Sequence, residues 1–313
     1  MVEKKYILCY NIYRIKEEYI FMSDVFCYHG IGENLLRYES IMNTGIFSAN
    51  RGMQIDGFEV NGTGGYNGQN NISVAIPHED NFGALRVYIM DGGISFYIRD
   101  VSYTLASETN HDSGYVDEAF VVDEIPKNRI SGIIVNSNIR KKKISQLSIL
   151  GNSAYGSIIP IAKTTLAVLA KIGIEGPNNF DELLNQINTT LEDESLDYSE
   201  REKKILQIKN KIDSELAKMV EVYYKTKLGK DDLDVMDVIN QFNTLGLPIL
   251  DENDVRKQCS GKQLPQRHFS YSTQSIGKRT VLGISSRPSY EETMRKVLGD
   301  YLMNKRQNQK EDR

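Results

Sequence analysis

Two stretches of the chain carry side chains whose types and spacing could do chemistry. The first is His29-Gly30, which ends the apolar run of residues 25–28, as a buried strand would present residues at a sheet edge. The His29 imidazole can donate or accept a hydrogen bond at either ring nitrogen, and Gly30 lets a ligand approach the backbone closely. Such a pair is also common in ordinary loops, so it indicates a site only in combination with other residues.

The second stretch is Asp117-Glu118, which opens a strand-like run over residues 118–123. A strand is a rigid element and would fix a carboxylate at its mouth. Because successive side chains of a strand point to opposite faces, only one of the two acidic residues can serve a given site. Without further evidence, the favoured interpretation of Glu118 is an exposed glutamate at a strand edge.

A third stretch, residues 68–75, is a loop that runs into a strand ending Ile72-Ser73-Val74-Ala75. In this order the three stretches resemble the ADP-ribosyltransferase fold of the diphtheria-toxin and poly(ADP-ribose) polymerase branch. There a His-Gly strand leads to a helix and an Ile-x-x-x-Gly-Ile/Leu motif, here residues 41–46. An Ile-Tyr-Phe-Ala-like strand follows, and a glutamate opens a strand similar to Glu-Tyr-Ile-Val-Tyr-Asp. The resemblance covers residues 25–135 and implies a split β-sheet of that family.

The resemblance implies NAD as the bound substrate and Glu118 as the catalytic residue. Cleavage of the nicotinamide–ribose bond passes through a transition state with oxocarbenium character, which a carboxylate near the ribose stabilises. By the same resemblance His29 would hydrogen-bond the adenosine-side ribose, and the Gly30 backbone would hold the nicotinamide amide. Ser73 stands where the polymerase-like branch has a tyrosine. A stacking ring for nicotinamide is therefore expected from Tyr66 or Tyr97.

The expected activity is NAD-dependent mono-ADP-ribosylation of a macromolecular acceptor with release of nicotinamide. The acceptor could be a protein side chain or a nucleic-acid base, and a host protein is favoured. Val116 lies two residues before Glu118, where arginine-modifying transferases carry an acidic or amide residue, so arginine is the less expected acceptor. No loop for binding a growing polymer is identifiable. The architecture looks like bacterial effectors and toxins. Two alternatives stay open: a catalytically degenerate NAD- or ADP-ribose-binding interaction protein, and an NAD glycohydrolase with water as acceptor.

The composition of the 313 residues is that of a globular protein, 40% hydrophobic and 26% charged. A net charge of −4 gives no general attraction to phosphate backbones, so nucleic acid is a less expected partner. Cys9, Cys27 and Cys259 are scattered, which predicts neither a disulfide framework nor a metal site. No membrane span and no signal peptide are recognisable. The expected location is the cytoplasm, or a host cytosol after secretion without a signal peptide.

The predicted fold class is α+β, with an ADP-ribosyltransferase-like catalytic domain over residues 1–140. Residues 6–10 look like a strand, and residues 85–90 and 94–98 look like a hairpin around Asp91-Gly92-Gly93. The glycine-dense residues 61–68 are either a hairpin connection or a loop that covers a cofactor. They have neither the P-loop nor the dinucleotide-binding pattern.

A mostly helical domain is predicted for residues 141–313, after a solvated basic connector at residues 140–143. Helices are expected over residues 158–172, 180–191, 199–228 and 231–242, the third with Ser199 and Glu202 as a capping box. A polar extended segment over residues 251–288 and a last helix over residues 290–305 follow. His78, His111 and His268 are expected at the surface.

Overall fold

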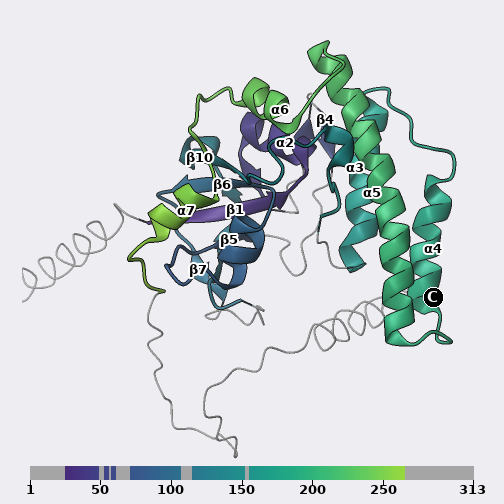
Figure 1. The fold of residues 1–313 in the computed structure, drawn as a ribbon, viewed down its shortest axis with the longest axis horizontal. Coiled ribbons are helices and arrows are strands. Elements are labelled where there is room, and N and C mark those ends of the chain that lie inside the picture. The colour runs from purple at the N-terminus through teal and green to yellow at the C-terminus, as the bar shows by residue number, and fades with distance from the viewer. Residues whose placement is uncertain are drawn as a thin grey trace, which may run out of the picture.

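The computed structural model describes residues 25–48, 53–55, 58–60, 71–106, 115–151 and 155–264. Its centre is a mixed seven-stranded sheet of order β11-β10-β6-β1-β5-β8-β7 (Figure 1). The strands of this sheet are β1 (Phe26–Gly32), β5 (Asn71–Ala75), β6 (Ile94–Arg99), β7 (Thr104–Leu105), β8 (Glu118–Val122), β10 (Ile130–Val135) and β11 (Ile249–Leu250). Two smaller antiparallel pairs join β2 (Ile46–Phe47) to β9 (Glu124–Ile125) and β3 (Met53–Ile55) to β4 (Phe58–Val60).

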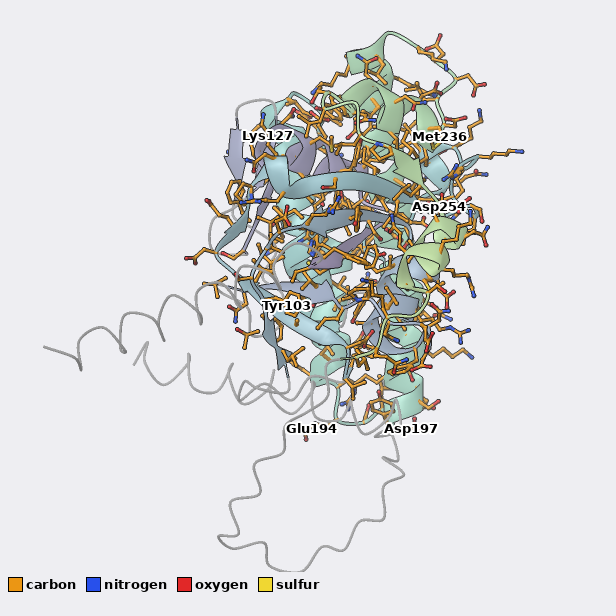
Figure 2. The ribbon with its side chains drawn as sticks, turned by 90° about the vertical axis from the view of Figure 1, so that its left-hand side faces the viewer. Tyr103, Lys127, Glu194, Asp197, Met236 and Asp254 are labelled. Atoms are coloured by element: carbon orange, nitrogen blue, oxygen red, sulfur yellow. The ribbon has the colours of Figure 1, made fainter. Side chains whose placement is uncertain are left out.

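The helices follow the apolar periodicity of the sequence. They are α2 (Leu35–Thr44), the π-helical η3 (Leu85–Met90), the short 3₁₀ turns η5 (Lys127–Arg129) and η6 (Ile144–Gln146), α3 (Tyr155–Lys171), α4 (Phe180–Glu192), α5 (Tyr198–Leu228), α6 (Val235–Phe242) and α7 (Glu252–Cys259). Helices α3, α4 and α5 stand side by side at one side of the sheet (Figure 1). The α4–α5 turn, with exposed Glu194 and Asp197, lies at one end of the molecule (Figure 2). None of the helices in these ranges is long and apolar enough to cross a membrane.

The sheet buries both of its faces. Cys27, Val74 and Phe96 belong to a large core that continues into helices α2 to α6. Tyr28 and Ala75, one residue along from Cys27 and Val74, belong to a smaller core against η3 and α7. This alternation follows from the two-residue period of a strand.

The predicted halves, residues 1–140 and 141–313, share one sheet and one large core. Strand β11 pairs in parallel with β10, in the registers Ile133–Ile249 and Ile134–Leu250. Buried side chains of α2 and α5 lie in the same core. Helix α7, which follows β11 in the chain, is held against the sheet by a hydrogen bond from the hydroxyl of Tyr28 on β1 to Oε1 of Gln258 at 2.8 Å.

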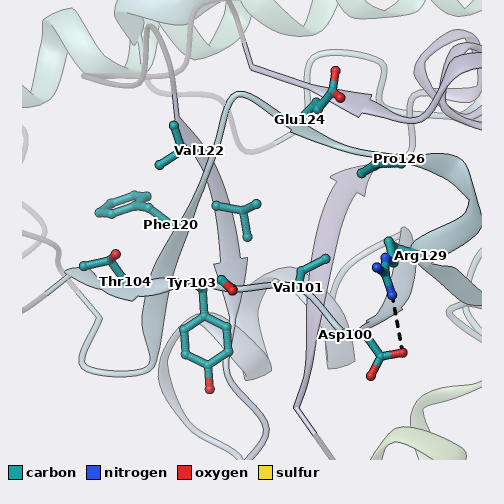
Figure 3. Close-up of a pocket in the computed structure, with 11 residues that line it drawn as sticks. Asp100, Val101, Tyr103, Thr104, Phe120, Val122, Glu124, Pro126 and Arg129 are labelled. Atoms are coloured by element: carbon teal, nitrogen blue, oxygen red, sulfur yellow. Dashed lines mark ion pairs between the residues drawn. The ribbon is translucent and has the colours of Figure 1, made fainter. Parts of the chain in front are cut away.

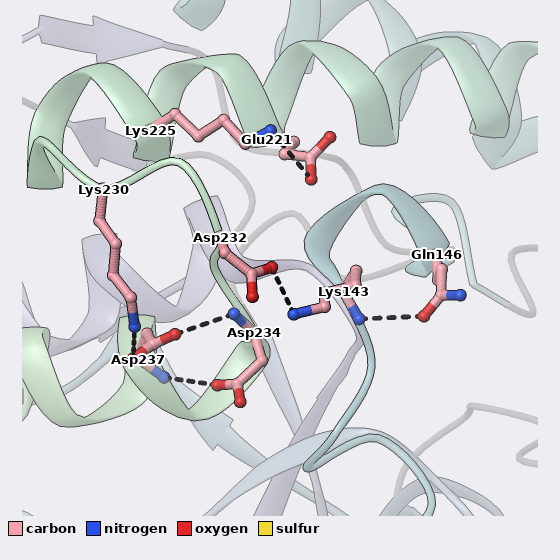
Figure 4. Close-up of polar contacts among 8 residues, drawn as sticks. All are labelled: Lys143, Gln146, Glu221, Lys225, Lys230, Asp232, Asp234 and Asp237. Atoms are coloured by element: carbon pink, nitrogen blue, oxygen red, sulfur yellow. Dashed lines mark hydrogen bonds and ion pairs between the residues drawn. The ribbon is translucent and has the colours of Figure 1, made fainter.

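The basic residues 140–143, predicted as a solvated connector, link separate parts of the chain. The Arg140 side chain donates to the carbonyl oxygens of Val135 and Leu250 at 3.0 and 2.7 Å. Nζ of Lys142 lies 2.8 Å from Oε1 of Glu33. Lys143 forms an ion pair at 2.5 Å with Asp232, which lies shortly before α6 in the sequence (Figure 4).

Several expected elements are confirmed. Strands β1, β5, β6 and β8 and helices α2, α3 and α4 form where the sequence indicates. The long helix also forms, but its capping box is Asp197 with Glu200 rather than Ser199 with Glu202. The last described helix before β11 begins at Val235 rather than residue 231, because Asp234 caps it.

Two expected elements are wrong. Residues 85–90, predicted as a strand, form η3, because the Asp117 carboxylate accepts hydrogen bonds from the backbone N–H groups of Ala84 and Leu85, each at 2.8 Å. Residues 252–259, predicted as extended, form α7, whose first turn is capped by Asp251. The expected strand at residues 6–10, the loop at 61–68 and the helix at 290–305 lie outside the described residues, as do His111 and His268.

Candidate functional site

Three neighbouring strands bring His29, Ser73 and Glu118 together. The residues come from β1, β5 and β8, which lie next to one another in the sheet. Nδ1 of His29 lies 2.8 Å from the carbonyl oxygen of Ser73, and Oγ of Ser73 donates to Oε1 of Glu118 at 2.5 Å. Ser73 is therefore the junction between the histidine and the carboxylate.

The strand registers place these side chains on two faces. Tyr28, Ala75 and Glu118 lie in one row across the sheet and share a face, which Gly30 and Ser73 also share by alternation. His29 follows Tyr28 directly and points to the opposite face. Between the described parts of β1 and β5 the only registered pair is Tyr28 with Ala75, and the His29 ring reaches the Ser73 carbonyl.

His29 is buried, with 6% of its surface exposed. Burial, followed by the nearby positive charge of Arg37, lowers its pKa to about 4, so the ring is neutral at pH 7. A carbonyl oxygen only accepts hydrogen bonds, so Nδ1 must be the protonated ring nitrogen. Nε2 is then an acceptor, and it is buried without a hydrogen-bond partner among the residues in the described ranges.

Glu118 is half-buried at the first position of β8, beside two tyrosines. Burial raises the pKa of Tyr88, and the charges of Tyr115 and Glu118 raise it further. The rings of Tyr88 and Tyr115 meet edge to face with centroids 5.6 Å apart. These are the aromatic side chains that the fold brings near Glu118, and the sequence analysis did not single them out.

Gly30 is required by the approach of η3. A β-carbon at this position would lie 2.6 Å from the carbonyl oxygen of Tyr88, closer than real β-carbons come to any such atom. The glycine of the His-Gly pair thus has a packing role. Its backbone contact with nicotinamide stays a prediction.

Asp117 is fully buried and has a structural role at the start of η3. Besides the two backbone N–H groups, its carboxylate lies 3.1 Å from Nε2 of His78. His78, expected at the surface, is itself fully buried, with its ring against Phe82. Of the acidic pair, Glu118 is the partly accessible member.

Of the two rings proposed for stacking on nicotinamide, Tyr97 does not lie beside Glu118. Tyr97 is three strands away on the same face, about 14 Å at ordinary strand spacing. Its ring packs against Phe26 and Tyr28, with centroids 5.2 and 5.8 Å apart. Tyr66 lies outside the described residues.

A surface hollow of about 420 Å³ lies at the other end of β8. Figure 3 shows Phe120, Val122 and Tyr103 around it, with the Arg129–Asp100 ion pair at 3.7 Å on its rim. The nearest lining residue on β8 is Phe120, two residues from Glu118 and about 7 Å away at ordinary strand rise.

Comparison with known proteins identifies no relative of this chain. No protein-family model matches the chain, and no curated protein or solved structure is significantly similar to it. Within the described ranges, no group of three or more His, Cys, Asp or Glu side chains is placed to hold a metal ion.

Proposed function

We propose that the protein is an NAD-dependent mono-ADP-ribosyltransferase that modifies a protein acceptor, with Glu118 as its catalytic residue. One observation carries the proposal. His29, Ser73 and Glu118 are separated by 44 and 45 positions in the chain, yet they form one hydrogen-bonded series across three adjacent strands. This meeting of residues from three short motifs supports the proposal.

The proposed reaction exchanges one bond at the ribose anomeric carbon. The bond to the nicotinamide nitrogen breaks, its electron pair leaves with nicotinamide, and positive charge develops on the ribose. Glu118 would face this charge, and a carboxylate held on a strand needs no reorganisation as the charge appears. An acceptor nucleophile then bonds to the same carbon and loses its proton.

Ser73 favours one alternative. Its hydroxyl already donates to Glu118, and a serine offers no ring for stacking on nicotinamide. A protein that binds NAD or ADP-ribose without cleaving it would tolerate this arrangement. An NAD glycohydrolase would use the same residues as the transferase, with water as acceptor.

The test is incubation of the full chain with labelled NAD and a eukaryotic lysate, with nicotinamide release and protein labelling measured in parallel. Glu118→Gln keeps the shape of the side chain and removes its charge, so release should fall at least about 100-fold, as on loss of one preorganised electrostatic group. Glu124→Gln is the matched control, an exposed glutamate on β9, and should release nicotinamide at the wild-type rate.

The outcomes separate the candidates. Labelled lysate proteins, located by mass spectrometry, support the transferase, and release without labelling supports the hydrolase. Binding of ADP-ribose without release supports the interaction protein. Wild-type release by Glu118→Gln would remove Glu118 from the catalytic role.

A further inference from the structure

Strand β8 has an open edge at Val122. Strand β7 begins at Thr104, which pairs with Phe120, and it runs from there toward the start of β8. Among the described residues, Val122 therefore has a neighbouring strand only on its β5 side, where it pairs with Asn71. Asp123 follows in the left-handed conformation, with φ 63°, and the strand ends there.

The backbone groups of Val122 are directed to this open side. In an antiparallel ladder, successive residues turn their N–H and C=O groups to opposite neighbours. The Ile76 N–H donates to the carbonyl oxygen of Asp117 at 2.9 Å, so Asp117 faces β5. Phe120 and Val122 lie an odd number of residues further along and face the β7 side. Phe120 meets Thr104 there, and Val122 comes just before the place where β7 begins.

The hollow of about 420 Å³ lies at the same edge. It exists because residues 100–103 pass away from β8: the Asp100 N–H donates to the carbonyl oxygen of Val25 at 3.0 Å, and the Val101 side chain is buried in the large core. Figure 3 shows Phe120 and Val122 along β8, with Val101 and Tyr103 on the segment below them. The apolar side chains that line the hollow are those of Val101, Tyr103, Phe120, Val121, Val122 and Pro126.

An open edge beside an apolar hollow is a combination that sheets ordinarily avoid. Proteins cover or charge their strand edges, because unpaired N–H and C=O groups pair with other chains. Here the residue at the edge is a valine, and 61% of its surface is exposed. The charges of Asp100 and Arg129, paired at 3.7 Å on the rim, cancel each other and favour neither an anion nor a cation.

These features together specify the chemistry of an occupant. The N–H and C=O groups of a strand edge are satisfied at once by another extended backbone. The hollow, within the range of about 300–1,000 Å³ typical of ligand pockets, has room for an apolar side chain of the same segment. A small aromatic molecule could fill the hollow, but it would leave the backbone groups of Val122 unused.

We propose that the hollow docks a short extended segment of a partner protein, which continues the line of β7 along β8. The backbone of this segment pairs with the N–H and C=O groups of Val122, and one of its apolar side chains fills the hollow. The proposal is independent of the NAD chemistry, because it uses no member of the series from His29 to Glu118.

The test uses the full chain and a library of fluorescently labelled, blocked pentapeptides. Each has serine at both ends and Val, Ile, Leu, Phe or Tyr at the three inner positions, and binding is measured by fluorescence polarisation. Members of the library should bind, and N-methylation of one inner residue of the tightest should weaken its binding about fivefold, as for one ordinary hydrogen bond. Acetylphenylalaninamide, a side chain without a strand, should bind more weakly than the tightest peptide. Hydrogen exchange of the Val122 amide should slow when that peptide is bound.

A pair of valine variants locates the binding. Val122→Lys replaces an apolar wall with the residue that natural edges use against pairing, so it should weaken peptide binding at least about 10-fold, the scale of one buried valine. Val222→Lys is the matched control, an equally simple change at a valine on α5 that is 50% exposed, and should bind the peptide as the wild type does. Val122→Thr keeps the branched shape and should retain most of the affinity. Thermal unfolding of all three should give the wild-type midpoint, because both valines are exposed.

Four results would overturn the proposal. The first is a library in which no pentapeptide binds. The second is a peptide whose affinity does not change on N-methylation at any inner residue, and the third is acetylphenylalaninamide bound as tightly as the peptide, which would make the hollow a site for small aromatic molecules. The fourth is Val122→Lys with wild-type affinity, which would place the peptide elsewhere on the molecule.

Discussion

The neutral, buried state of His29 predicts a specific loss of stability in acid. In the folded protein its pKa is lowered to about 4, against 6.5 for an unperturbed histidine. On unfolding, the ring becomes free to take up a proton below pH 6.5. The unfolded state therefore binds more protons than the folded state between these values, and the free energy of unfolding falls as the pH falls. The contribution is fully present above pH 6.5 and is lost progressively down to about pH 4.

The magnitude follows from the difference in pKa. At 1.36 kcal/mol for each tenfold change in proton affinity, the lowering from 6.5 to about 4 corresponds to about 3.4 kcal/mol. That is a large part of the about 5–15 kcal/mol that stabilises an ordinary domain. The protein should be markedly easier to unfold at pH 4 than at pH 7.

The matched variant is His29→Asn. Its side-chain amide has a donor where His29 has Nδ1–H, so the hydrogen bond to the Ser73 carbonyl has a replacement, and the amide does not titrate. Urea unfolding of both proteins at several values from pH 7 to pH 4 gives the comparison, because carboxylates common to both cancel. The wild type should lose about 3 kcal/mol more than His29→Asn over this window. Parallel stability curves would show that His29 does not titrate as a buried neutral ring.

Two further predictions concern packing and the helical half. Gly30→Ala introduces a β-carbon 2.6 Å from the Tyr88 carbonyl oxygen, so η3 must shift, and urea unfolding should show a loss of about 1–3 kcal/mol; unchanged stability would mean that the contact relaxes freely. Reversing Lys203, Lys204 and Lys211 to Glu, on the exposed side of α5, should change stability by no more than about 0.5 kcal/mol each and should leave nicotinamide release from NAD unchanged. If release were lost, the helical half would contribute to the NAD site itself.

The sequence was most informative where local pattern and tertiary environment agree. The buried stripe of α5, with Ile205, Ile212 and Leu216, repeats at helical spacing, and packing against the core requires that same spacing. The strand β1, with its apolar residues, and the strand β8, with its acidic first residue, were predicted correctly for the same reason. The meeting of His29 with Ser73 was expected only through family resemblance, since no local rule specifies which strands become neighbours.

The errors arise where a distant residue decides the local structure. Residues 85–90 are β-branched and aromatic enough for a strand, but the Asp117 carboxylate, 32 and 33 positions away, satisfies the first N–H groups of a helix there. His78 is buried through the same carboxylate.

The parallel ladder between β10 and β11 has a consequence for how the chain folds. Its paired residues, Ile133 with Ile249 and Ile134 with Leu250, are more than a hundred positions apart, so closing it costs chain entropy that no local contact repays in advance. During synthesis on a ribosome, the edge of β10 that pairs with β11 stays unpaired until the whole helical region has been synthesised. During that interval an apolar strand edge is available to other chains. Aggregation during synthesis should therefore depend on how quickly α3 to α6 fold and deliver β11 to the sheet.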